Sequence, residues 1–407
     1  MPRIKSIKDV VSWGLCTGCG ACFYVCTKKA VSLENVADSG IRPSFNENCE
    51  NCENCTECLT ICPGINIICS RDNNNARIVN GPLIEILEGY STDNEIRYRG
   101  SSGGLLSSLA LYCLERENMS FVIHTGMNEA NPFCNKTVQS FNKKDLKKHA
   151  GSRYSPSSPC DQLELIEKAE NPCVFIGKPC DVAAIELLRK RRPELDMKLG
   201  LVLSFFCAGV PCKRGTLDII KSMNIDCNDV TDLRYRGHGW PGDFAVTHKN
   251  EISRLSYQES WGKLSQGCRP YRCHICPDSF GASADICCGD AWHKFNGDNI
   301  GESLVLVRKQ RGKDIMDRAI RSNYIEVTRS EERNLFLSSN SLINKKKQIF
   351  GRLIAMKLLF IPIPKYKSFS IFESWLELSL KDKIRSILGS LRRLIMRGLW
   401  HKAEVKK

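Results

Sequence analysis

The sequence has no long hydrophobic run. An apolar stretch such as residues 201–210 is far shorter than the roughly 20 residues that a membrane-spanning helix needs. The N-terminus lacks the pattern of a secretory signal, so we expect a protein of the reducing cytoplasm, where disulfides are rare. No strand-linked G-x-G-x-x-G motif is present either. These absences argue against an integral membrane protein, a secreted disulfide scaffold and a Rossmann site for NAD(P).

Excess positive charge is missing from most of the chain. The net charge is +14, yet residues 342–407 contain sixteen Lys or Arg and only four Asp or Glu, which accounts for +12 of it. A nucleic-acid-binding domain usually carries its basic residues across one face of the fold. The local excess therefore argues against a nucleic-acid partner.

Cysteine, in contrast, is abundant, with 23 residues. Two runs share the spacing C-x2-C-x2-C-x3-C, which binds a 4Fe-4S cubane in bacterial two-cluster ferredoxins. The first run is Cys16, Cys19, Cys22 and Cys26, and the second is Cys52, Cys55, Cys58 and Cys62. In this arrangement the fourth cysteine of each run binds the other cluster. We therefore assign one cluster to Cys16, Cys19, Cys22 and Cys62, and the other to Cys52, Cys55, Cys58 and Cys26.

Zinc and disulfides are the alternatives for these cysteines. Zinc sites usually use two separated C-x2-C pairs, and disulfides need an oxidising compartment. Cys62 is followed by the expected proline, whereas Cys26 is followed by Thr27, a mild departure. Cys49 and Cys69 are left over. The continuous spacing favours two 4Fe-4S clusters.

Beyond the cysteine runs, strands alternate with helices. Residues 121–123, 172–177 and 199–207 are candidates for buried strands. Apolar residues at helical spacing follow the second of them, with Asp181 as the expected N-cap. Strand, helix and strand at this spacing predict an α/β domain with a parallel sheet. Residues 230–292 are rich in Gly, Cys and Trp, which is typical of loops around a site.

Two short stretches have the composition of phosphate-binding loops. The stretch Ser102-Gly103-Gly104 directly precedes an apolar helix predicted over residues 105–114, where free backbone N–H groups can bind a phosphate. The stretch Ser152-Arg153-Tyr154 offers a similar phosphate or ring contact. Each signal is weak alone, because many helices begin after Ser and Gly.

Four cysteines outside the N-terminal runs are candidates for a third cubane. Cys180 and Cys207 each follow a predicted strand, at the edge where α/β sheets place ligands. Cys273 and Cys276 form a separate C-x2-C pair. An isolated cysteine is more often a buried apolar side chain, so the spacing alone leaves this group open. The competing ligands are Cys268, Cys287 and Cys288.

In their order along the chain, these motifs resemble the coenzyme F420 hydrogenase/dehydrogenase beta-subunit family of flavin and iron–sulfur proteins. The resemblance covers roughly residues 77–307. Its motifs are Ser102-Gly103-Gly104, Ser152-Arg153-Tyr154, Gly177-x-Pro179-Cys180, Phe206-Cys207, Cys273-x2-Cys276-x-Asp278, Ala284-Asp285 and Gly289-Asp290. It implies an FAD held near the glycine loop, with Gly177 among its contacts, and a 4Fe-4S cluster on the four cysteines. Lys178 and Asp181 stand where many members have Thr and Gln, which leaves the substrate open.

The resemblance and the cysteine runs together predict an iron–sulfur flavoprotein oxidoreductase. A cluster carries one electron, a hydride acceptor takes two, and a flavin exchanges either number. We expect electrons to pass from the ferredoxin-type clusters through the inner cluster to FAD, and on to F420 or another organic hydride acceptor, or in reverse. The alternative is an electron-transfer subunit that relays electrons to a partner catalytic subunit.

Three residues of one glycine-rich stretch are candidates for the substrate side of the flavin. Arg236 can hold an anion, His238 can donate a proton near neutral pH, and Trp240 can cover a planar ring. The other interpretation of each residue is a loop that packs on itself. The expected partners are accordingly a small-molecule substrate and a redox partner, which is ferredoxin, F420 or a catalytic subunit.

The C-terminal residues predict a basic amphipathic helix. From residue 379 to residue 400, apolar residues recur at helical spacing with Lys and Arg between them. Such a helix can lie on an anionic membrane, here its inner face, or dock on a partner, or pack on the main domain. Similar family members with a basic extension occur among polysaccharide-biosynthesis proteins, which implies a substrate handled near the membrane.

We therefore predict an α/β protein, α+β overall, in three parts. Residues 1–75 form a 4Fe-4S ferredoxin-type domain, and residues 76–335 form an α/β domain that binds flavin and an iron–sulfur cluster. Residues 336–407 form a basic helical tail. The predicted location is the cytoplasm, with peripheral contact at the membrane through the tail.

Overall fold

The computed structural model describes residues 2–46, 55–69, 79–266, 269–297 and 300–403. Cys49, Cys52 and Cys268 lie outside these residues, so the roles given to them above stay predictions. Within the described ranges, no helix combines the length and the apolar character that crossing a membrane requires.

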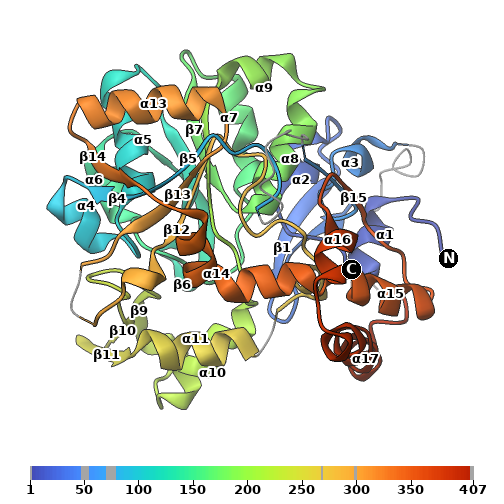
Figure 1. Cartoon of the computed structure of the whole chain (residues 1–407). Coiled ribbons are helices and arrows are strands. Elements are labelled where there is room, and N and C mark those ends of the chain that lie inside the picture. The colour runs from blue at the N-terminus through green and yellow to red at the C-terminus, as the bar shows by residue number, and fades with distance from the viewer. Residues whose placement is uncertain (1, 47–54, 70–78, 267–268, 298–299, 404–407) are drawn as a thin grey trace.

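A mixed sheet of eight strands forms the centre of the molecule (Figure 1). Its strands are β4 (Glu85–Ser91), β5 (Val122–Asn128), β6 (Asn131–Ser140), β7 (Cys173–Gly177), β8 (Leu199–Phe205), β12 (Ile286–Asp290), β13 (Ser303–Val307) and β14 (Ile325–Arg329). Their order is β14-β4-β13-β12-β8-β7-β5-β6. β12, β8, β7 and β5 pair in parallel, and the outer strands pair antiparallel. The α/β class is confirmed, and the predicted parallel pairing holds for the central strands.

Alternating side chains of the central strands supply two apolar cores, one on each face of the sheet. Val174 packs with Leu109 of α5 (Leu105–Arg116), against which α13 (Gln310–Arg321) also lies. Its neighbour Phe175 points to the other face and packs with Val182 of α8 (Pro179–Arg189). The two-residue period of a strand thus places helices on both faces. Smaller helices complete the layers: α4 (Asn94–Arg99), α6 (Lys143–Lys148), α7 (Leu163–Glu167) and α9 (Pro193–Lys198).

Helix α8 begins two residues before the predicted N-cap. Lys178 is its N-cap and Pro179 its first residue. Asp181 is therefore the third residue of the helix, and its carboxylate accepts a hydrogen bond from the backbone N–H of Lys178 at 2.8 Å. This start places Cys180 in the first turn of the helix, at the carboxyl end of β7.

Residues 230–292, predicted as loops, contain a second sheet and two helices. Its three antiparallel strands are β9 (Val230–Arg234), β10 (Phe244–His248) and β11 (Glu251–Leu255). The helices are α11 (Tyr257–Gln266) and α12 (Tyr271–His274), and α10 (Lys213–Ser222) packs against α11. Leu233 and Phe244 share a core with Ile220 of α10. The loop prediction was wrong for these elements because five-residue strands leave little periodicity to recognise.

The two ends of the chain lie side by side (Figure 1). The N-terminal elements are α1 (Ile7–Ser12), α2 (Ala21–Val25), β1 (Val31–Val36), β2 (Gly40–Phe45), α3 (Glu57–Thr60) and β3 (Asn66–Ile68). The C-terminal elements are α14 (Glu332–Lys347), α15 (Ile349–Leu358), β15 (Lys365–Lys367), α16 (Ile371–Leu376) and α17 (Leu380–Met396). Strand β15 pairs in parallel with β3, and Val10 and Leu15 share a core with Met356 and Leu394. The predicted C-terminal helix is present as α17, and the segment around it packs on the N-terminal elements.

Candidate functional site

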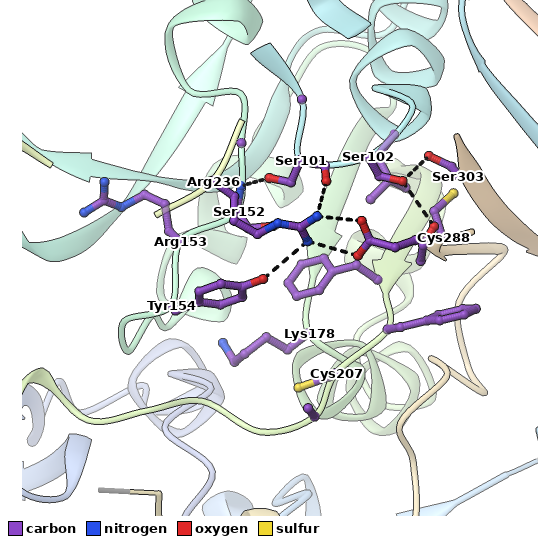
Figure 2. A pocket seen from close by; sticks show the side chains of 18 of the residues that line it. Ser101, Ser102, Ser152, Arg153, Tyr154, Lys178, Cys207, Arg236, Cys288 and Ser303 are labelled. Carbon is purple, nitrogen blue, oxygen red and sulfur yellow. Dashed lines mark hydrogen bonds and ion pairs between the residues drawn. The ribbon is translucent and has the colours of Figure 1, made fainter. Parts of the chain in front are cut away.

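A cavity of about 360 Å³ lies at the carboxyl ends of β7, β8 and β12. Its wall includes residues 100–102 before α5, residues 104–107 at the start of α5, residues 149–155, residues 205–211 at the end of β8 and after it, and residues 288–290 of β12. Figure 2 shows side chains from these segments around one space. The carboxyl ends of parallel strands are where α/β sheets bind ligands.

The glycine loop before α5 is built for close approach of backbone. A Cβ atom on Gly103 would lie 2.5 Å from the carbonyl oxygen of Gly89 and 2.8 Å from the backbone nitrogen of Ser303. Gly104, the N-cap of α5, has a φ of +72°, which residues with side chains rarely adopt. No side chain caps this twelve-residue helix, whose first turn lines the cavity. Backbone N–H groups at such a helix start suit a phosphate.

Hydroxyl groups join this loop to its neighbours. The Ser102 hydroxyl donates to the carbonyl of Glu302 at 2.8 Å. The Ser101 hydroxyl accepts the backbone N–H of Ser152, as Figure 2 shows. The two stretches predicted to bind phosphate are therefore brought together at one wall of the cavity, although they are far apart in the sequence.

The other predicted flavin contacts play different parts. The Arg153 guanidinium points away from the other labelled side chains in Figure 2 and donates to the carbonyls of Leu233 and Pro132, each at 2.7 Å. These bonds hold its loop to β9 and β6. The Tyr154 ring lies on Trp261, with ring centroids 4.6 Å apart, and both line the cavity.

Gly177 is outside the cavity wall. A Cβ atom there would lie 2.6 Å from the ring of Phe175 and 2.9 Å from Cβ of Asp181. The absence of a side chain at this position allows the turn from β7 into α8 to close tightly. Its neighbours Ile176 and Lys178 line the cavity, and the contact of Gly177 with a cofactor stays a prediction.

Arg236 lies at the cavity but its charge is already paired. The guanidinium is 2% exposed and forms two hydrogen bonds with the Asp290 carboxylate, at 2.7 and 3.0 Å. It also donates to the backbone carbonyls of Ser101 and Pro241, at 2.5 and 2.9 Å. Burial alone would lower the pKa of Arg236, and the Asp290 carboxylate instead raises it. Arg236 therefore fixes the glycine loop to β12, and its contact with a substrate anion stays a prediction.

The structure does not bring His238 and Trp240 to the cavity wall. His238 is exposed, with a φ of +61°, and its ring centroid lies 5.3 Å from that of Tyr98. Trp240 is 6% exposed, and its indole N–H donates to Asp290 at 2.8 Å. Of the three predicted residues, Arg236 therefore lines the cavity. Trp240 contacts two residues of the cavity wall, Asp290 and Trp292.

The aromatic wall comes from residues that no sequence motif had marked as ligand contacts. Trp292 stacks between Trp240 and Tyr257, with centroid distances of 5.2 and 5.3 Å. Trp292 and Tyr257 both line the cavity, where the Arg236 guanidinium lies over their rings. The sequence feature that could have pointed to Trp292 is the Gly289-Asp290 motif, which lies just before it. Tyr257 has no such marker, because its place depends on how α11 packs.

A buried ion pair closes the cavity wall near β7. Lys178 and Asp181 are 4% and 0% exposed, and their Nζ and Oδ2 atoms are 2.8 Å apart. The Lys178 ammonium also donates to the carbonyl and hydroxyl of Ser157, at 2.8 and 3.0 Å. Burial favours the neutral form of Lys178, but the Asp181 carboxylate raises its pKa above the usual value. Burial in turn raises the pKa of Asp181, which the Lys178 ammonium opposes, and the pair lies beside Cys180.

The four predicted inner cysteines come together beside the cavity. Burial, with the nearby thiols of Cys273 and Cys276, raises the pKa of Cys207 to about 12. Burial and the Asp181 carboxylate raise the pKa of Cys180, and the thiols of Cys207 and Cys276 add to the effect. Cys207 also lines the cavity (Figure 2). The group therefore shares a wall with the space that the glycine loop faces.

The N-terminal cysteines gather in the crossed arrangement. Burial raises the pKa of Cys22, and the thiols of Cys19, Cys16 and Cys62 contribute, which places the last cysteine of the second run with the first run. Burial and the thiols of Cys26 and Cys55 raise the pKa of Cys58 to about 12. Cys58 also acts on Cys22, so the two groups are neighbours. The fourth member of the second group, Cys52, is outside the described residues.

Two competing cysteines lie apart from the inner group. Cys287 and Cys288 are buried in β12, burial raises the pKa of both thiols, and no thiol of the inner group is among the causes of either shift. Cys268 is outside the described residues. Cys180 is therefore a better fourth member of the inner group than Cys288.

Within the part of the chain that the structure describes, no three His, Cys, Asp or Glu side chains converge on a point that could hold one metal ion. The thiols of each group are close enough to shift one another's pKa without meeting at such a point. The sulfurs of a cubane bind four different irons, so they stand further apart than the ligands of a single zinc ion. The thiols that gather in each group are the donors that a 4Fe-4S cluster needs.

The fold and the site define an α/β protein with a ligand cavity at the carboxyl ends of its central strands and a group of cysteines beside that cavity. Residues 86–164 match the family model for the N-terminal part of the coenzyme F420 hydrogenase/dehydrogenase beta subunit. Residues 171–333 match the model for the C-terminal part of the same coenzyme F420 hydrogenase/dehydrogenase beta subunit. The chain belongs to this beta-subunit family, as the order of its motifs predicted.

Known relatives agree with this assignment. The chain is similar to the coenzyme F420 hydrogenase subunit beta of Methanosarcina barkeri, at 22% identity over 259 residues, which is 62% of this chain and 84% of the relative. It is also similar to the coenzyme F420 hydrogenase subunit beta of Methanothermobacter thermautotrophicus, at 23% identity over 296 residues, which is 70% of this chain and 100% of the relative. A chain of the F420-reducing [NiFe] hydrogenase complex from Methanosarcina barkeri shares the fold, with a TM-score of 0.54 and 20% identity over 72% of this chain and 97% of that chain.

Proposed function

We propose that this chain is an iron–sulfur flavoprotein that moves electrons between its clusters and a hydride-exchanging substrate, coenzyme F420 or another organic acceptor. The observation that carries the proposal is the position of Cys207, which belongs to the inner cysteine group and lines the cavity. A cluster on that group would touch the wall of the flavin site. The names of the relatives supply F420 as the first candidate substrate.

The cavity has the features that an FAD needs. Gly104 and the start of α5 would accept the pyrophosphate, because both line the cavity and no side chain forms a capping hydrogen bond at the Gly104 N-cap. Tyr257 and Trp292 offer flat aromatic surface elsewhere on the wall. The Arg236–Asp290 pair fixes the loop between these two regions, so the backbone is already placed before a ligand binds.

Three cysteine groups would hold three 4Fe-4S clusters. Cys16, Cys19, Cys22 and Cys62 hold the first, and Cys26, Cys55 and Cys58 with Cys52 hold the second. Cys180, Cys207, Cys273 and Cys276 hold the inner one. A bound flavin supplies the exchange between single electrons and electron pairs. The chain holds these groups in one order, from its N-terminal elements to the cavity, and this order serves electron flow in either direction.

Reduction by F420 tests this function and separates it from the alternative of a relay subunit. The full-length protein is purified anaerobically, and reduced F420 or dithionite is added while absorbance is followed at about 450 nm, where oxidised flavins absorb. We expect reduced F420 to bleach the flavin and oxidised F420 to restore it. Bleaching by dithionite alone, with no response to F420 in either direction, would favour a subunit that relays electrons to a partner catalytic subunit.

The outer face of α17 suits an anionic membrane surface. Ser386, Ser390 and Leu394 face inward, and a Cβ atom on Gly351 of α15 would overlap the Ser386 hydroxyl, so the two helices pack closely. The opposite face exposes Leu380, Ile384, Leu388, Ile395 and Met396. The exposed basic residues beside them are Lys381, Arg385, Arg392 and Arg397. Apolar side chains flanked by cations match the interface of a bilayer with anionic lipids.

We propose that this face brings the protein to the membrane, where a substrate of polysaccharide biosynthesis would be within reach. Sedimentation with vesicles tests the contact. Vesicles with phosphatidylglycerol should bind the wild-type protein, and binding should fall at least about tenfold for I384E/L388E, because each added carboxylate is repelled by the anionic surface. Equal binding to neutral phosphatidylcholine vesicles, or no loss in the variant, would contradict the proposal.

A further inference from the structure

Arg272 is a buried cation between the N-terminal and the inner cysteines. It directly precedes Cys273 in α12 and is 1% exposed. Its Nε atom donates to the carbonyl of Gly64 and its Nη2 atom to the carbonyl of Pro63, both at 2.8 Å. These two residues follow Cys62, and a Cβ atom on Gly64 would lie 3.1 Å from the Cys62 sulfur. One side chain therefore connects the loops of two cysteine groups.

The charge of Arg272 has no carboxylate partner among the described residues. Arg272 directly precedes Cys273 in α12, and the thiols of Cys276 and Cys180 are also among the groups that act on it. A buried cation is stable only when an opposite charge or a full set of hydrogen bonds compensates it. The neighbours that can supply negative charge are the inner cysteines, which become thiolates when they bind iron.

The other contacts of Arg272 also involve the segment that carries the inner cysteines Cys273 and Cys276. The Tyr366 ring of β15 covers the guanidinium, with the centroid 5.5 Å away, and its hydroxyl donates to the carbonyl of Ile275 at 2.7 Å. The Nη1 atom is buried without a hydrogen-bond partner. A buried donor of this kind needs an acceptor, and a cluster sulfur is one that this location would supply.

We propose that Arg272 is the counter-charge of the inner cluster. Its positive charge raises the reduction potential of that cluster above the potential of the neighbouring N-terminal cluster. The proposal rests on the proposed function. Transfer of one electron to the inner group adds one negative charge beside Arg272, and no bond breaks and no proton moves. A fixed cation stabilises that added charge, and net charge and hydrogen bonds to sulfur are the features that set cluster potentials. Arg272 is thus a positioning residue for electron transfer.

Two substitutions separate charge from packing, and a third is a matched control. R272Q keeps a donor for the loop carbonyls and removes the charge, whereas R272K keeps the charge. Arg308 is equally buried, at 1% exposed, and is held by the carbonyls of Phe280 and Asn80. The inner cysteines are not among the groups that act on Arg308, so R308Q tests the loss of a buried arginine in itself.

The experiment is an anaerobic redox titration of the full-length, cluster-loaded protein, followed by electron paramagnetic resonance. We expect R272Q to lower the midpoint potential of the inner cluster by at least about 59 mV. At the wild-type midpoint this corresponds to a tenfold lower ratio of reduced to oxidised cluster, because one electron is transferred. R272K and R308Q should stay near the wild-type midpoint. Equal shifts in R272Q and R272K, or no shift in R272Q, would overturn the proposal.

Two further outcomes are decisive. If R272Q does not fold, R272K alone decides, because a large shift in a variant that keeps the charge contradicts the role of charge. If the wild-type protein shows only the two N-terminal clusters after loading, the proposed function fails, and this is seen before any variant is compared.

Discussion

The N-terminal cysteines and the inner cysteines reach their groups in different ways. Cys16, Cys19 and Cys22 are neighbours in sequence, so short turns alone bring them together. Cys180, Cys207 and Cys273 come from three separate elements and meet only once the central sheet has formed. The spacing of the N-terminal cysteines can therefore be recognised in the sequence, whereas the inner cysteines are recognised as a group only from the fold. The chain places the fold-dependent group at the cavity.

The surroundings of the two regions differ as well. The N-terminal groups are enclosed by short helices and by the C-terminal elements, which share their core. The inner group has one side toward the cavity, through Cys207, and another toward Arg272. In the proposed function, electrons would pass between the clusters and the ligand at this inner region. Substitutions in each region can test this division.

Loss of Cys207 should have the largest effect. C207S removes the ligand that both belongs to the inner group and lines the cavity, so iron content should fall by about a third and electron transfer to the flavin by about 100-fold or more. Iron analysis and anaerobic stopped-flow absorbance measure these losses. The matched control is C113A, which alters a buried cysteine of α5 outside the three groups. Wild-type transfer rates in C207S would remove the inner group from the path.

The crossed assignment predicts opposite losses from two cysteines. C62S should abolish the cluster on Cys16, Cys19 and Cys22, and C26S should abolish the other N-terminal cluster. Each variant should lose about four irons, because one cubane holds four. Resonance spectra of the two reduced variants should differ, since a different cluster survives in each. Identical spectra would show that the cysteines do not cross.

The glycine loop should control flavin binding rather than iron. G103A places a Cβ atom 2.5 Å from the carbonyl oxygen of Gly89, which displaces the backbone at the start of α5, so flavin affinity should fall at least about tenfold. Cluster content should stay near that of the wild type. G389A is the control, because a Cβ atom there meets nothing within 4 Å. Unchanged flavin content in G103A would contradict the placement of the phosphate.

Much of the site's composition could be predicted from the sequence, because spacing carries local information. The N-terminal runs and the glycine loop are short patterns that can be recognised in the sequence without knowledge of the fold. The state of Arg236 could not be predicted in this way, since its partner Asp290 belongs to a different strand. Trp292 and Tyr257 were missed for the same reason. His238 and Trp240 were selected for their chemistry, but a tight turn with a φ of +61° at His238 directs them elsewhere.

The fold was predicted where segments are long and apolar. Residues 172–177 and the helix after them stand out because both faces of β7 are buried. The strands of residues 230–255 are short and have exposed positions, so their pattern is weak. The packing of the C-terminal elements on the N-terminal elements could not be predicted from the sequence. A helix with apolar residues on two sides can pack against several different partners.

The buried ion pair at the cavity wall should matter for stability. K178M leaves the Asp181 carboxylate buried without its partner, which should lower the free energy of unfolding by about 3–5 kcal/mol. The double variant K178M/D181N should recover part of this loss, since both charges are gone. Anaerobic urea unfolding measures the difference. Equal stability of K178M and the wild type would show that Lys178 does not compensate a buried charge on Asp181.

Lys346 should give the smallest effect, which depends on pH. Burial lowers the pKa of Lys346 to about 8, whereas an unfolded lysine titrates near about 10.4. Between these values the unfolded chain binds more protons, so the free energy of unfolding should rise as pH increases through this window, by roughly 2 kcal/mol. The rise should be absent from K346M. The difference between wild-type and K346M unfolding curves at pH 8 and pH 10 isolates it, and a constant difference would contradict the lowered pKa.

The content of iron and flavin in protein purified without oxygen tests the central claim most directly. We expect about twelve irons and one FAD per chain, as three cubanes and one filled cavity require. Protein that holds zinc in place of iron, or that holds iron but no flavin after loading with FAD, would contradict it.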